Sequence, residues 1–217
     1  MKIYKTALGK ILTTALFASL SLNVACAPVS KISASTTGNA LTQAYVWYDG
    51  EREQKIWLNP QLVADFSLGA EKQNALQASN VAATPLQTKQ SQPNMRLWKL
   101  GSVSASAASD AIQSLQSRQP AGKYSPVFHD GSGSAASMRA LPGNIIVYLN
   151  PAWDATLVDA WVKKRKLEIV KKLDIGPNIY VIKTGPGLEA LDTANTLYKS
   201  GEVNAAFPDW WQGVEAK

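Results

Sequence analysis

The stretch that decides the fold reads LEALDTANTLYKSGEVNAAFPD and occupies residues 188–209. Apolar side chains recur in it at helical spacing and predict one face of an amphipathic helix. Gly201 stands where a residue with positive φ commonly ends a helix. Residues 203–207 are then expected to form a short strand that Pro208 stops. The helix face consists of Leu188, Leu191, Ala194, Asn195 and Tyr198.

The residues before this unit predict a complete β-α-β-β-α-β order that starts at Gly143. Residues 145–149, 167–173 and 178–183 are rich in the β-branched and aromatic side chains that favour strands. Asp154 is the expected cap of the helix between the first two strands. The inward side chains of that helix are expected to be Leu157, Val158, Trp161 and Val162.

The first half of the chain predicts a weaker version of the same order. Asp49-Gly50 is a hairpin signal between two aromatic-rich strands, and Asn59-Pro60 is expected to form a turn, like Asn150-Pro151 in the second half. Strands are expected at residues 62–68, 95–100 and 124–128, helices at 73–79 and 104–117, and a further strand is a candidate at 81–86. The expected fold class is therefore α+β, with two ferredoxin-like βαββαβ modules, the first degenerate, and antiparallel sheets with helices on one face.

The amino-terminal segment has the features of an export signal. Residues 1–10 carry three lysines and no acid, and the apolar run at residues 11–22 is too short to cross a bilayer. Cys26, the only cysteine, stands where bacterial lipoproteins are cleaved and acylated, and plain signal-peptidase cleavage is the alternative. We therefore expect an exported protein, in the bacterial envelope or secreted, that a lipid on Cys26 would attach to the membrane.

These patterns predict five segments along the chain. A signal peptide (residues 1–25) and a flexible spacer rich in Ser and Thr (26–41) precede a degenerate module with an aromatic hairpin (42–129). A Gly- and Ser-rich linker (130–142) then leads to the second module and its carboxyl-terminal tail (143–217).

The charge of the chain gives no support for a nucleic-acid partner. The full chain carries +6, but three positive charges lie in the segment expected to be removed, which leaves +3 (6 − 3). The only dense basic run, at residues 163–166, is expected to be a solvated helix end, where cations complement the helix dipole.

One face of the second sheet is expected to be apolar and free of helices. Both helices of such a module cover the same face, and alternation along each strand sends every second side chain to the other face. An apolar patch there indicates an interaction surface, unless the first module covers it. We expect the helix side to carry Ile145, Val147, Leu149, Ile169, Val181 and Phe207. The open face then carries Ile146, Tyr148, Val170, Tyr180 and Ile182.

The carboxyl-terminal third resembles the end of the propeptide of subtilisin-like serine proteases. The resemblance lies in Ala194-Asn195, Leu197-Tyr198, Ser200-Gly201, Val203, Ala206 and Pro208-Asp209, with GNIIVYLNP at residues 143–151 and NIYVIKTG at 178–185 upstream. It implies a domain that helps a secreted protease to fold and blocks its active site, with the open sheet face packed on the enzyme. It also implies that the tail lies extended in the protease cleft, held by β-augmentation. The tail residues concerned are Pro208, Asp209, Trp210, Trp211, Val214 and Glu215; packing of the two tryptophans on their own domain is the alternative.

The sequence holds no pattern of a catalytic or cofactor-binding site, so we expect a protein that is not an enzyme and needs no cofactor. His129 is the only histidine and is expected to be a solvated loop residue, which leaves no base for Ser–His–Asp chemistry. One histidine and one cysteine do not make a metal cluster, and no Gly-rich loop has the form that cradles phosphate.

Three functions are compatible with these patterns. The first is a non-catalytic, propeptide-like protein that binds a subtilisin-like serine protease as a folding chaperone or inhibitor. The second is the leader or remnant of a split or truncated protease precursor. The third is an envelope lipoprotein with a structural or glycan-binding role, suggested by the hairpin that carries Trp47 and Trp57.

Overall fold

The computed structural model describes residues 43–67, 81–86, 95–101, 104, 106–131 and 138–213. Within them the fold is mixed α and β, mostly strand, with two antiparallel sheets and three helices. No helix among these residues is long and apolar enough to cross a membrane. The expected export signal, Cys26, the spacer and the expected helix at residues 73–79 lie outside the described residues.

The first sheet is built around the long strand β2. Its strands are β1 (Ala44–Asp49), β2 (Arg52–Asp65), β3 (Ala83–Leu86), β4 (Arg96–Leu100), β5 (Tyr124–His129), β6 (Met138–Ala140) and β11 (Trp211–Gln212). The hydrogen-bonded order is β11-β6-β5-β2-β4-β3, and β1 pairs with β2 in the expected hairpin. Strand β3 occupies the candidate position at residues 81–86, whereas β6 lies within the segment expected to be a linker.

The prediction of a turn at Asn59-Pro60 is wrong. Strand β2 runs through both residues, and its register against β5 shifts between Asn59 and Val63. Because proline has no N–H to give to the ladder, an irregular stretch of this kind accommodates it without ending the strand. The side-chain oxygen of Asn59 accepts the N–H of Gln61 at 2.9 Å, a turn-like bond kept inside a strand.

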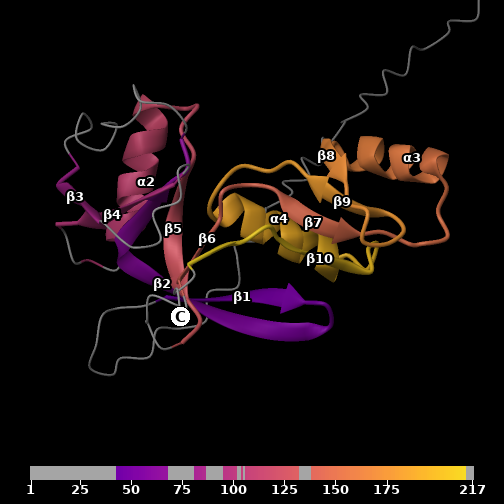
Figure 1. Ribbon diagram of the computed structural model, residues 1–217, viewed down its shortest axis with the longest axis horizontal. Coiled ribbons are helices and arrows are strands. Elements are labelled where there is room, and N and C mark those ends of the chain that lie inside the picture. Colours follow the sequence, from indigo (N-terminus) through magenta and orange to yellow (C-terminus); the bar gives the residue numbers. More distant parts are fainter. Residues whose placement is uncertain are drawn as a thin grey trace, which may run out of the picture.

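Helix α2 (Ala107–Arg118) covers the first sheet as the sequence pattern predicts. It begins after Ser106, and Ala108, Ile112 and Leu115 are buried along one face. Figure 1 shows α2 beside β4 and β5 at the end of the molecule opposite α3.

The second sheet follows the predicted order of elements. These are β7 (Ile145–Tyr148), α3 (Ala155–Arg165), β8 (Ile169–Lys172), β9 (Ile179–Ile182), α4 (Leu188–Lys199) and β10 (Ala205–Pro208), and the strands lie in the order β10-β7-β9-β8. The side chain of Asp154 caps α3 by accepting the N–H of Leu157 at 2.9 Å, and Gly201 ends α4 with φ at 68°. Both signals were readable in the sequence.

Two local expectations in this half are wrong. Leu157, expected to point inward, is 51% exposed. Only Val158 and Trp161 of α3 are buried, so the apolar stripe of this helix is narrower than its sequence indicates. Pro208 is the last residue of β10 and pairs with Ile145. A proline fits there because β10 is an edge strand.

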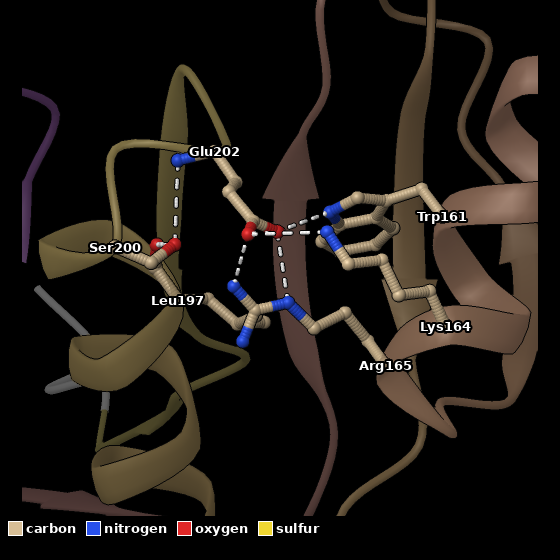
Figure 2. A network of polar contacts seen from close by, with 6 residues as sticks. All are labelled: Trp161, Lys164, Arg165, Leu197, Ser200 and Glu202. Carbon is tan, nitrogen blue, oxygen red and sulfur yellow. Dashed lines mark hydrogen bonds and ion pairs between the residues drawn. The ribbon is translucent and has the colours of Figure 1, made fainter.

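Glu202, just after α4, ties that end of the helix to α3 (Figure 2). Its Oε2 accepts the indole N–H of Trp161 at 3.0 Å and the Nε–H of Arg165 at 2.8 Å, and Oε1 lies 2.6 Å from an Arg165 amino group. These bonds lower the pKa of Glu202, first through Arg165 and then through Trp161. The backbone N–H of Glu202 donates a hydrogen bond to the Ser200 Oγ at 3.3 Å.

One hydrophobic core runs through both halves of the chain. Tyr45, Leu58 and Phe128 of the first sheet belong to the same buried cluster as Val147 and Leu191 of the second half. The hairpin lies beside α4 and β10 (Figure 1). The two halves therefore pack as one body.

Candidate interaction surface

Strand β7 shows which side of the second sheet is open. Ile145 and Val147 are completely buried, whereas Ile146 and Tyr148 are half-buried, so alternate side chains face opposite sides. Residues directly opposite one another in antiparallel strands share a face, and the register therefore extends this division across the sheet. The open face carries Ile146, Tyr148, Ile179, Val181, Ala205, Phe207 and Lys171.

Tyr180 and Ile182, expected on the open face, lie on the helix side. Tyr180 pairs with Val147 and Ile182 pairs with Ile145, both of which point into the core. Strand β9 reads Ile-Tyr-Val-Ile and all four residues are buried. Because every position is apolar, alternation in the sequence cannot tell which side chains point inward.

Val181 and Phe207, expected on the helix side, lie on the open face. Phe207 pairs with Ile146, and its ring centroid is 5.7 Å from that of Tyr148. Ala206 takes the inward position, where its small side chain lets α4 approach β10 closely, and it is 1% exposed.

Val170 of β8, also expected on the open face, stands at an irregularity of the register between Ile169 and Lys171 and is 50% exposed.

Most of this open face lies outside the described core clusters, although Phe207 also packs against the edge of the main one. Ile179 and Val181 are buried, yet they belong to neither of the two hydrophobic core clusters, whereas Ile182 and Tyr180 on the helix side do. Ile179 and Val181 are only 4% and 3% exposed, so the accessible part of this face consists of residues on either side of β9. The described residues leave a shallow apolar surface, with Tyr148 and Phe207 only half-buried.

Charged groups lie at the edge of this surface. Lys171 shares the open face with Val181 and is exposed. Burial raises the pKa of Asp209, and the positive charge of Lys171 offsets part of that rise. The open face thus combines a partly desolvated carboxylate, a lysine and an apolar centre, which suits contact with a protein surface.

The carboxyl-terminal tail folds back onto the first sheet. Trp211 and Gln212 pair with Ala140 and Arg139 of β6, and the N–H of Gly213 donates to the Met138 carbonyl at 2.9 Å. Trp211 is only 8% exposed and packs in the smaller core cluster.

Trp210 anchors the same tail from the other side. Its ring lies 5.6 Å from that of Trp47 and 6.0 Å from that of Phe128. The guanidinium of Arg139 lies 5.4 Å from the Trp47 ring and 5.8 Å from the Trp210 ring, while its Nε is 2.6 Å from Asp130.

These contacts correct the expected position of the tail. Pro208 belongs to β10, Asp209 follows it, and Trp210 and Trp211 pack on their own domain, so these residues do not project as an extended strand. Burying two indoles and pairing β11 with β6 stabilises the folded-back arrangement. Val214 and Glu215 lie outside the described residues.

The aromatic hairpin is part of the core. Tyr45 and Trp47 are buried, and Tyr48 stacks on Tyr198 of α4 with ring centroids 4.4 Å apart. The amide of Asn195 donates to the carbonyl of Val46 at 2.8 Å. The hairpin therefore does not present Trp47 as a free platform for a sugar.

His129 lies in a strand, which corrects the expected solvated loop. It is the last residue of β5 and is 7% exposed. Its Nε2 lies 3.0 Å from the side-chain nitrogen of Asn59 in β2. Within the described residues, no group of three or more His, Cys, Asp or Glu is placed to hold a metal ion.

A cleft of about 240 Å³ lies between α2 and the start of α4. Ile112, Pro126 and Leu188 supply apolar lining, and Glu189 adds a carboxylate. That carboxylate already accepts the N–H of Gly185 at 2.8 Å. The cleft therefore contributes to the junction between the halves and offers no arrangement of reactive groups.

No family model, curated protein or solved structure matches this chain. The likeness of residues 188–209 to subtilisin propeptides thus stays a hypothesis drawn from the sequence.

Proposed function

We propose that this protein binds a subtilisin-like serine protease through the open face of its second sheet, as a propeptide-like folding chaperone or inhibitor without a catalytic domain. The strand order β10-β7-β9-β8, with the intervening α3 and α4, is that of a ferredoxin-like βαββαβ module. The path β5-β2-β4-β3 repeats this order in the first sheet, which supports two related modules.

The observation that carries the proposal is the apolar open face. Tyr148, Phe207 and Ile146 form a half-buried apolar surface on this face. A sheet face of this kind buries apolar area when a partner packs on it, and aromatic side chains at the centre of an interface supply much of the binding energy.

The folded-back tail restricts how such a complex forms. While Trp211 pairs with β6, the chain up to Gly213 is held on the first sheet. Docking of the sheet face needs no change in that arrangement. Binding is therefore proposed through the face and not through residues 208–213.

Gel filtration and a peptidase assay test the proposal with subtilisin as the probe. The protein is expected to form a complex and to slow hydrolysis of a peptide substrate. Tyr148→Ser and Phe207→Ser are expected to weaken binding at least roughly tenfold, because each removes an aromatic side chain from the centre of the face. Leu157→Ser removes an exposed apolar side chain from α3 and is the matched control.

The result that contradicts the proposal is equally specific. If a folded protein neither co-elutes with the protease nor changes its rate, protease binding is wrong. If Leu157→Ser weakens binding as much as Phe207→Ser, the open face is not the site.

A further inference from the structure

The strongly exposed large hydrophobic side chains of the described chain all lie between residues 157 and 175, close to its densest group of cations. Val170 is 50% exposed and Ile175 is 70% exposed. Residues 163–172 contain six basic residues and one acidic residue. We propose that the outer edge of the second sheet, formed by the end of α3, strand β8 and the turn before β9, binds the anionic headgroups of a lipid surface.

The fold brings these residues to one edge. Strand β8 is the last strand of the sheet, and Figure 1 shows β8 and α3 at the end of the molecule remote from α2. Lys166 adopts a left-handed conformation that ends α3, and the N–H of Leu167 donates to the Val162 carbonyl at 3.0 Å. The chain therefore turns directly from the basic end of the helix into the basic strand.

Most of the cations at this edge are available for a ligand. Glu202 occupies Arg165 at 2.6 Å and, more loosely, Lys164 at 3.9 Å. Lys163, Lys166 and Lys172 are exposed and form no ion pair with another described residue. Lys171 is exposed as well, and its charge also acts on Asp209.

Lysines point to both sides of β8. Lys171 pairs with Val181 on the open face, and Lys172 pairs with Tyr180 on the helix side, with its ammonium 5.8 Å from that ring. Residues 163–175 carry six basic residues against two acidic ones, Glu168 and Asp174, so the edge as a whole is positive. A charge distribution of this kind fits an extended anionic surface better than a single anion.

The edge is unsuited to adding a strand from another protein. The register of β8 slips between Ile169 and Lys171, and slips and lysines on an edge strand are the features that prevent strand addition. A lipid surface requires no backbone pairing. It attracts juxtaposed lysines and accepts exposed aliphatic side chains such as Val170 and Ile175 at its interface.

Vesicle sedimentation tests the proposal. The experiment uses the full chain with the substitution Cys26→Ser, so that no lipid can be attached. Any binding by the amino-terminal segment is then the same in all variants. Binding to vesicles of phosphatidylcholine with phosphatidylglycerol is expected to exceed binding to phosphatidylcholine alone and to fall with added salt. Lys171→Glu with Lys172→Glu is expected to lower partitioning roughly tenfold or more. The control pair Lys99→Glu and Lys123→Glu, exposed lysines of the first half, is expected to change it little.

A fluorescent probe tests the depth of the contact. Ile175→Cys in the same background, labelled with a polarity-sensitive dye, is expected to shift to the blue on anionic vesicles, whereas Lys99→Cys is not. Equal losses for the two charge-reversed pairs would overturn the proposal. So would binding to an acidic protein with no preference for anionic vesicles. Lipid binding requires no protease, so failure here is separate from failure of protease binding.

Discussion

Trp210 packs edge-on against Trp47, with ring centroids 5.6 Å apart and planes at 69°. Trp47 belongs to β1, the first described strand, and Trp210 lies in the tail just after β10. In the described part of the chain, neither indole N–H has a hydrogen-bond partner. The contact is therefore held by packing and by Arg139, which lies over both rings.

Trp210→Ala is expected to loosen the tail. The substitution removes a half-buried indole that contacts Trp47 and Phe128, and should lower the free energy of unfolding by about 2–4 kcal/mol. Hydrogen exchange at the amide of Gly213, bonded to Met138, should become faster. Gln212→Ala, at an exposed position in the adjoining strand β11, is the control and should stay within about 0.5 kcal/mol. Unchanged exchange in Trp210→Ala would show that the tail is held by other contacts.

Asn195→Ala is expected to weaken the attachment of the hairpin to α4. Its amide donates to the Val46 carbonyl at 2.8 Å in a buried position, and removing the donor leaves that carbonyl without this bond. The free energy of unfolding should fall by about 1–3 kcal/mol, measured by urea titration. Asn204→Ala changes an exposed asparagine and should have little effect. Equal stability of the two variants would mean that packing alone holds the hairpin.

Asp192→Asn is expected to stabilise the protein at neutral pH. Burial raises the pKa of Asp192, and Oδ1 has no hydrogen-bond partner within the described residues. The folded state therefore binds the proton more tightly than the unfolded chain. The resulting stability is fully present below the unfolded pKa of about 3.9 and is lost as pH rises through the raised folded pKa. Asparagine cannot ionise, so it avoids this loss.

Urea titrations of Asp192→Asn and the unsubstituted protein across this pH range measure the effect. The two should converge in acid and separate toward neutral pH, with the variant more stable. Asp159→Asn, on the exposed surface of α3, is the control and should follow the unsubstituted protein. The negative charge of Asp192 also raises the pKa of Tyr45, after burial, so the variant should lower that pKa. A constant difference at all pH values would contradict the assignment.

Glu202→Gln is expected to lower Tm at neutral pH. It keeps an acceptor for the indole of Trp161 but loses the charge that pairs with Arg165 (Figure 2). The pKa of Glu202 is lowered in the folded state, so its contribution is present above the unfolded pKa of about 4.3 and is lost as pH falls through the lowered folded pKa. Calorimetry at both ends of this range should show the variant and the unsubstituted protein approaching one another in acid. Glu168→Gln, whose ion pair with Lys183 is exposed, should change Tm less.

Local signals predicted much of the element order. Three of these signals depend only on bonds and dihedral angles within a few residues, so they can be predicted from the sequence. They are the Asp154 cap, Gly201 at the end of α4 and the hairpin turn at Gly50. The open face was predictable only in part. Ile146 and Tyr148 follow from alternation in β7, but β9 is apolar at every position and its direction had to come from pairing with Ile145 and Val147.

Sequence patterns could not predict where the tail packs or that His129 is buried. Trp210 and Trp211 would suit a free binding segment or a buried one equally well, and the choice depends on Trp47 and Arg139, which come much earlier in the chain. His129 is buried because β5 pairs with both β2 and β6.

The sequence by itself therefore determined where the helices and most strands of the second half begin and end, since capping, turn geometry and periodicity act between near neighbours in the chain. Only the tertiary structure decided which side of β9 faces the helices, that the tail returns to β6, and that both halves share one core. Those outcomes depend on contacts between residues far apart in the chain, whose free energy no local pattern records.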